Sequence, residues 1–178
     1  MVRASSADLP DAELMRLPYL SAYDSIGSNF RHGANFATGG STIRRQHETI
    51  FQSGISPFFL DVQIVHFHRF QSRAEELYKQ EKNKLPRPRK FSKSLYTIDI
   101  GQTDLAVGFR QMSNIQLRTA IPDIINQFSA AVTVVYATFN NFIMSLIRLT
   151  VILFDSVHIN KERGHFGYTT RVQSVAYQ

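Results

Sequence analysis

The chain has 178 residues, no cysteine and a formal net charge of +6. The absence of cysteine excludes a disulfide framework, a thiolate metal site and a cysteine nucleophile. A hydrophobic content of 43% excludes an intrinsically disordered chain, and this length is sufficient for one domain with a sizeable core. We interpret the positive charge as dispersed over the surface, while an acidic partner, such as a membrane surface or nucleic acid, stays open.

The apolar segments predict neither a signal peptide nor a membrane span. The first ten residues contain no apolar stretch of signal-peptide length, so the sequence assigns no compartment. Phe142 to Phe154 is strongly apolar, but Arg148 interrupts it and it is short for a span. We expect a buried segment there.

The first half of the chain changes from loop-forming to helix-forming residues at Pro57. Residues 26–56 are rich in Gly, Ser, Thr and Asn, which predicts short strands and loops. Within them, Ala34 to Thr38 is a strand candidate that runs into Gly39 and Gly40. After Pro57, apolar side chains recur at spacings of three and four. They predict a helix whose buried face is formed by Ile64, Phe67, Phe70, Ala74, Leu77 and Tyr78.

A linker and a strand follow that helix. Asn83 to Lys93 is basic and contains prolines that a helix interior would not tolerate, so it predicts a solvated linker. Leu95 to Ile100 is apolar and partly β-branched and stops at Gly101, which predicts a buried strand followed by a turn.

A second helix is predicted after Ser113. This serine and Gln116 have the spacing of a capping box, and an apolar helical stripe runs from Leu117 to Val132. We expect the helix to bend or restart at Pro122. Strands that alternate with helices predict an α/β layered domain, in which ligands gather at the carboxyl ends of the strands. The turns at Gly39-Gly40 and at Gly101 to Asp104 are in such positions.

Four stretches resemble the plant GDSL esterase/lipase family, and the likeness covers roughly residues 17–136. Ser25 to Ile43 (SIGSNFRHGANFATGGSTI) is similar to the family's second block, and Tyr96 to Leu105 (YTIDIGQTDL) is similar to its third, Gly-x-Asn-Asp. Gly54 to Ile64 (GISPFFLDVQI) and Ile121 to Phe128 (IPDIINQF) also look like that family. The acetylesterase and fucosidase-like members are the most similar subgroup.

The resemblance implies a three-layer α/β/α sandwich around a mostly parallel sheet and hydrolysis of carboxylic esters by a serine nucleophile with aspartate and histidine. It also implies oxyanion donors: a backbone amide at Gly40, with Gly39 as the alternative, and an asparagine side chain in the slot that Thr103 occupies here. A threonine hydroxyl can still donate a hydrogen bond, but it is shorter than a carboxamide and aims differently.

The ends of the chain depart from the family pattern, which implies a partial domain over residues 1–136 and a divergent apolar and then polar tail over 137–178. The Gly-Asp-Ser block of the nucleophile is absent, and Ser25 lacks the required strand-turn-helix context. We therefore expect a missing central strand, and we expect Phe142 to Phe154 to fill part of that gap. Asp155 and His158 match the spacing of the family's last block, but chance explains such a match, so they are retained only as candidates.

Other candidate sites are interpreted as structural. His66 and His68 point to different sides of a helix, and we expect neither a metal nor a cofactor. Asp104 is expected to hold the turn after its strand. A basic cluster in the linker could contact phosphates but is interpreted as solvated; it comprises Arg87, Arg89, Lys90 and Lys93.

The leading hypothesis is a GDSL-type ester hydrolase homologue, inactive as this truncated chain, with an ester or acylated small molecule as the family's substrate. We expect no nucleic acid partner. The family is typically secreted, whereas this sequence leaves the location open. Two alternatives are a non-catalytic ligand-binding remnant and a basic surface-binding module.

Overall fold

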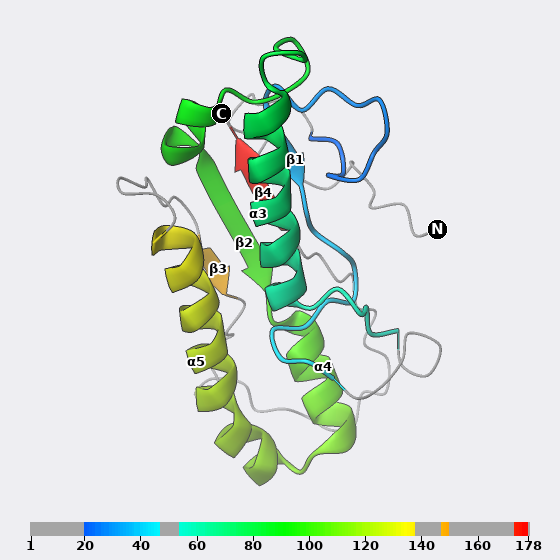
Figure 1. The fold of residues 1–178 in the computed structure, drawn as a ribbon. Coiled ribbons are helices and arrows are strands. Elements are labelled where there is room, and N and C mark those ends of the chain that lie inside the picture. The colour runs from blue at the N-terminus through cyan, green and yellow to red at the C-terminus, as the bar shows by residue number, and fades with distance from the viewer. Residues whose placement is uncertain (1–19, 47–53, 138–146, 150–172, 178) are drawn as a thin grey trace.

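The structure, a computed structural model, describes residues 20–46, 54–137, 147–149 and 173–177 (Figure 1). Its elements mix strands and helices, which confirms the α/β class. In chain order they are β1 (Gly33–Asn35), α3 (Leu60–Leu77), the 3-10 helix η1 (Pro88–Lys93), β2 (Leu95–Ile100), α4 (Gln102–Gln111), α5 (Asn114–Ala137), β3 (Ile147–Leu149) and β4 (Gln173–Tyr177). The strand at Leu95–Ile100 has the predicted bounds, whereas β1 ends before the predicted Phe36 to Thr38.

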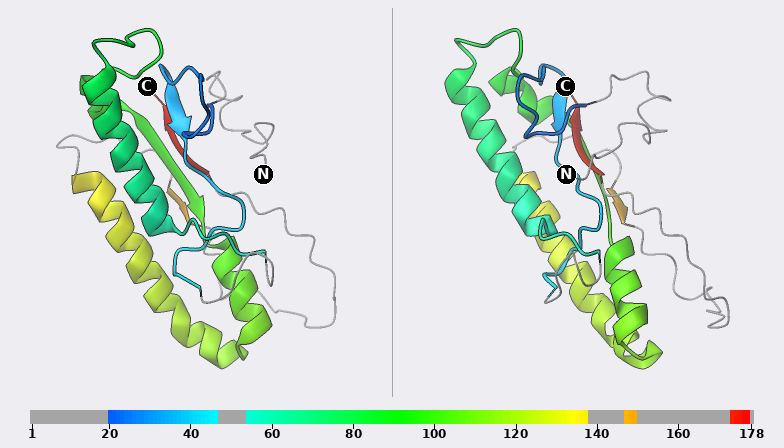
Figure 2. Two further views of the ribbon diagram at one scale, coloured as in Figure 1. Left: turned by 45° about the vertical axis from the view of Figure 1, so that its right-hand side comes forward. Right: turned by 90° about the vertical axis from the view of Figure 1, so that its right-hand side faces the viewer.

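The strands form one sheet in the order β1-β4-β2-β3. β4 is antiparallel to both β1 and β2, and β3 is parallel to β2. It follows that β1, β2 and β3 run in one direction and β4 in the other (Figure 2). The carboxyl ends of β1 and β2 therefore point toward the same edge of the sheet, where α4 begins.

The expected filling of the sheet by Phe142 to Phe154 is wrong for the part that is described. Within that stretch only β3 is described, and it lies on the outer side of β2, with Ile147 opposite Ile98. The position between β1 and β2 is occupied by β4, with Ala176 opposite both Ala34 and Tyr96. Apolar character predicts that a segment is buried, but it does not determine which strand the segment pairs with.

The helices α3 and α5 lie against one face of the sheet (Figure 2). Alternate residues of β2 meet this layer, because side chains two apart on a strand point to one face. Tyr96 packs in a cluster with Phe67 and Phe91, while Ile100 packs with Leu60 and Phe128. The described residues thus contain one helical layer on the sheet, and the second layer of the predicted sandwich stays a prediction.

The predicted buried face of α3 is confirmed. Phe67 and Ala74 are buried, and Ile64 and Phe70 pack against the core from partly buried positions. The aromatic rings meet edge to face: Phe67 lies 5.4 Å from Tyr96, and Phe70 lies 5.6 Å from Phe36, between ring centroids. Such pairs contribute beyond the area that they bury, so this cluster fixes α3 on the sheet.

The capping box of α5 is also confirmed. The backbone N–H of Gln116 donates to the Ser113 hydroxyl at 3.3 Å, and the Gln116 side chain accepts from Ser113 N–H at 2.9 Å. The expected restart at Pro122 is wrong, because α5 continues through it. Pro122 and Arg118 are both exposed, so the turn that lacks the Pro122 N–H donor lies on the solvent side of α5. None of the described helices, α5 included, is long and apolar enough to cross a membrane.

The segment predicted as a solvated linker packs against the core. It contains η1, in which Phe91 is 2% exposed and lies 6.4 Å from the rings of Phe67 and Phe70. The prolines exclude an α-helix, as expected, but they allow the tighter 3-10 turn. The prediction failed because one buried aromatic outweighs the basic residues around it, whose charges stay in water.

The Tyr96 hydroxyl secures this segment, since it donates to the Phe91 carbonyl at 2.9 Å in a buried position. Burial raises the pKa of this hydroxyl. We expect Tyr96→Phe to lower the free energy of unfolding by about 1 kcal/mol, because it removes one buried hydrogen bond while the Phe91 carbonyl keeps the Ser94 N–H as a donor. Urea unfolding measures the loss, and Tyr78→Phe, at a half-buried ring, is the matched control. Equal effects of the two substitutions would contradict this assignment.

Candidate functional site

The candidate site lies where β2 ends and α4 begins. Gly101 takes a left-handed conformation, with φ of 115°, and α4 starts at the next residue. Thr103 and Asp104 stand in the first turn of α4, and both are buried. No described residue is a hydrogen-bond partner of the Thr103 hydroxyl. A buried hydroxyl without a partner is costly, so such groups are often functional.

Asp104 joins this turn to the loop after β1. Its carboxylate accepts hydrogen bonds from the backbone N–H groups of Ile43, at 2.7 Å, and Arg44, at 3.1 Å. The sequence predicted a structural role for Asp104 within its own turn, whereas the observed bonds hold a segment about 60 residues earlier. No local sequence pattern predicts these two hydrogen bonds, because both donors are main-chain N–H groups, which every residue except proline carries.

The loop after β1 is itself held by short bonds. Gly40 has φ of 78°, and its carbonyl accepts from Ser56 N–H at 2.9 Å. The Ser41 hydroxyl donates to the Phe58 carbonyl at 2.7 Å, and the Thr42 carbonyl accepts from Leu60 N–H at 3.0 Å at the start of α3. These bonds give the loop one fixed path between β1 and α3.

Space around the two glycines distinguishes Gly40 from Gly39. A Cβ at Gly40 would overlap the carbonyl oxygen of Gly54, whereas Gly39 has nothing within 4 Å of such an atom. No described residue accepts a hydrogen bond from the Gly40 N–H. Position 40 therefore requires glycine, and its backbone N–H has no partner in the described part of the chain.

Burial dominates the electrostatics of Asp104. The side chain is 1% exposed, and burial raises the pKa of its carboxyl to about 6, against the opposing effect of the Ile43 and Arg44 amides and the Arg44 charge. Arg44 also forms a salt bridge with Asp123 of α5 at 3.4 Å. The loop is therefore tied to both α4 and α5.

The remaining candidates do not join this site. Asp155 and His158 lie outside the described residues. Ser25 lies in a turn, its N–H bonded to the Ala22 carbonyl at 3.0 Å, and none of the described residues 26–46 is helical. His66 stacks on Tyr23 at 4.8 Å between ring centroids, and burial lowers the pKa of its imidazole. Among the described residues no three acidic or histidine side chains form a metal-binding group.

Replacing the Asp104 carboxylate should change how stability depends on pH. The folded-state pKa is raised from 3.8 to about 6, so folding favours the protonated form. This stabilisation is complete below pH 4 and is lost as pH rises through 6; the shift corresponds to about 3 kcal/mol. We expect the wild-type chain to lose up to that amount relative to Asp104→Asn between pH 4 and pH 7.5 in urea unfolding. The neighbouring Thr103→Val is the control, and its effect should be equal at both pH values.

Gly40 should tolerate no side chain. We expect Gly40→Ala to lower the free energy of unfolding by at least about 2 kcal/mol, because it combines a left-handed backbone with an overlap against a main-chain oxygen. Gly39→Ala, the matched control, should stay within about 0.5 kcal/mol. Urea unfolding compares the two variants. Equal stability of Gly40→Ala and Gly39→Ala would contradict the observed path of the loop around Gly40.

Comparison with known proteins places this chain in a family. A family model described as GDSL-like Lipase/Acylhydrolase matches residues 3–166. The chain is similar to a GDSL esterase/lipase of Arabidopsis thaliana, with 61% identity over 70% of this chain and 34% of that protein. It is similar to alpha-L-fucosidase 3 of the same plant, with 50% identity over 70% of this chain and 35% of the relative.

A third relative is an esterase of Hevea brasiliensis, 44% identical over 70% of this chain and 33% of that protein. The chain thus spans about a third of the length of these relatives. No solved structure gives a significant match. The family model covers most of the sequence, and the resemblance predicted from the glycine-rich turns is confirmed: the chain belongs to the GDSL-like lipase/acylhydrolase family.

Proposed function

We propose that these residues supply the oxyanion side of an active site that hydrolyses carboxylic esters. One observation carries the proposal: the Gly40 amide and the Thr103 hydroxyl, both without a partner among the described residues, stand on two segments joined by the Asp104 carboxylate. The names of the similar proteins, GDSL esterase/lipase and esterase, support an ester as substrate.

In this proposal the two donors act when an ester carbonyl becomes tetrahedral. The carbonyl oxygen then gains a negative charge, and donors already in position stabilise it without reorganisation. The Asp104 bridge contributes by fixing the loop after β1 relative to α4, so it is a positioning residue. Thr103 replaces the family's asparagine, and its shorter hydroxyl reaches less far toward the same oxygen.

The nucleophile is proposed to come from residues other than these 178, which contain no Gly-Asp-Ser sequence. A serine hydroxyl attacks only after a histidine accepts its proton, and oxyanion donors alone leave a modest acceleration over water. We therefore propose that the 178-residue chain by itself is inactive. Asp155 and His158 stay candidates for the acid and base, and as a pair they could activate only a water molecule.

The proposal is tested with short-chain p-nitrophenyl esters and a fluorophosphonate probe. We expect neither turnover above an inert protein nor covalent labelling of the 178-residue chain. Labelling at Ser25, located by mass spectrometry, or turnover abolished by His158→Ala would show a different active site. Binding of an acylated ligand without labelling would instead favour the non-catalytic alternative.

Thr103 provides the sharper test, in a polypeptide that also carries the Gly-Asp-Ser block. We expect Thr103→Asn to raise kcat up to about a hundredfold with little change in KM, since one oxyanion donor contributes about 3 kcal/mol to transition-state binding. Thr103→Val, which keeps the shape and removes the hydroxyl, should lower kcat. A rise in turnover for Thr103→Asn in the 178-residue chain alone would contradict the dependence on an added serine.

A further inference from the structure

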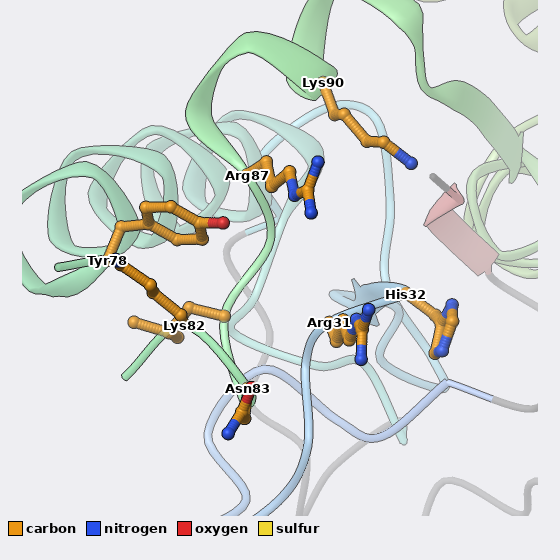
Figure 3. A pocket seen from close by; sticks show the side chains of 8 residues that line it. Arg31, His32, Tyr78, Lys82, Asn83, Arg87 and Lys90 are labelled. Carbon is orange, nitrogen blue, oxygen red and sulfur yellow. The ribbon is translucent and has the colours of Figure 1, made fainter. Parts of the chain in front are cut away.

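A cationic pocket lies at the other end of β2 from the candidate site. It has a volume of about 440 Å³, within the range of small-molecule sites. Its walls come from the turn before β1, the segment after α3, and η1 (Figure 3). The lining side chains that matter are Arg31, His32, Tyr78, Lys82, Arg87 and Lys90.

The pocket walls are held together by the main chain. Phe30 N–H donates to the Lys84 carbonyl at 2.7 Å, which joins the turn carrying Arg31 to the segment carrying Lys82. The Phe30 ring also meets Phe70 of α3 edge to face at 5.4 Å. The concave shape is therefore built from packed backbone rather than from side chains alone.

The charge of the pocket is uncompensated in the described structure. Four lining residues are permanent cations, and none of the described lining residues is acidic. Among the described salt bridges, none involves Arg31, Lys82, Arg87 or Lys90, and the neighbouring Glu81 pairs with Lys84. Like charges around one cavity repel each other, and a bound polyanion would relieve that repulsion.

We propose that this pocket binds a small organic polyanion with two or more phosphate groups. Two guanidinium groups, at Arg31 and Arg87, suit bidentate contacts to phosphate oxygens, and the Lys82 and Lys90 ammonium groups add charge. The Tyr78 hydroxyl supplies a neutral donor. A strand of nucleic acid fits less well, because Tyr78 and His32 supply the aromatic rings among the described lining residues, and two rings offer no row for successive stacked bases.

Isothermal titration calorimetry of the full chain with inorganic tripolyphosphate tests the proposal. We expect one site per chain, at least tenfold tighter than inorganic phosphate, with an affinity that weakens as KCl is raised. Arg31→Gln and Arg87→Gln should each weaken binding about tenfold, and the double variant should abolish it. The control is Arg110→Gln with Arg118→Gln, which removes the same charge from exposed residues of α4 and α5 and should leave binding unchanged.

Each result decides the matter. No binding of tripolyphosphate at low ionic strength would contradict the proposed site. An equal loss of affinity in the control variant would show that diffuse surface charge, and not this pocket, attracts the anion. A dodecamer of thymidylate that binds tighter than tripolyphosphate through Arg31 and Arg87 would overturn the assignment to a small ligand. All four arginines are exposed, and unchanged thermal unfolding verifies that each variant is folded.

The source of the phosphates is distinguished by vesicles. Phosphatidylcholine vesicles containing phosphatidylinositol bisphosphate should retain the wild-type chain, and not the double variant, if the ligand is a lipid headgroup. If tripolyphosphate binds through both arginines and the vesicles retain nothing, the ligand is a soluble phosphorylated molecule rather than a lipid headgroup. Both results support the pocket, whereas vesicle binding that survives Arg31→Gln with Arg87→Gln contradicts it.

Discussion

The bond between the Asp104 carboxylate and two backbone amides is the constraint on which the arrangement of this domain depends. It connects the loop after β1 to the first turn of α4, two segments about 60 residues apart in the chain. The same loop starts α3 through the Thr42 carbonyl and meets α5 through Arg44 and Asp123. The Asp104 side chain thereby holds the loop that connects α3, α4 and α5 at one edge of the sheet.

This constraint carries an electrostatic cost that the fold only partly offsets. Two amides and the Arg44 charge favour the ionised carboxylate, yet burial outweighs them and the pKa rises. The bridge therefore keeps its geometry at the expense of some stability near neutral pH. Since protons bind the folded state more tightly here, acid strengthens rather than weakens this part of the structure, contrary to most paired carboxylates.

Local features were predictable from the sequence, and pairings over long distances were not. The strand at Leu95–Ile100, the buried face of α3 and the Ser113 capping box each depend on residues a few positions apart. The place of β4 between β1 and β2, and the bond from Asp104 to Ile43, depend on main-chain groups that any sequence provides. Family resemblance identified Gly40, but only the surrounding backbone explains why a side chain cannot replace it there.

The cationic pocket also depends on residues far apart in the chain, so the sequence did not predict it. The basic residues before β2 were interpreted as a solvated cluster, because Arg31 and His32, which line the same pocket, lie more than 50 positions earlier. Six residues of β2, about 20 Å of extended chain, separate this pocket from the Asp104 bridge. Among the described residues no hydrogen bond or salt bridge joins the two places, so changes at one should add to changes at the other with little coupling. The proposed oxyanion donors and the proposed polyanion pocket therefore lie at opposite ends of one strand, so a substitution that removes one function should leave the other unchanged.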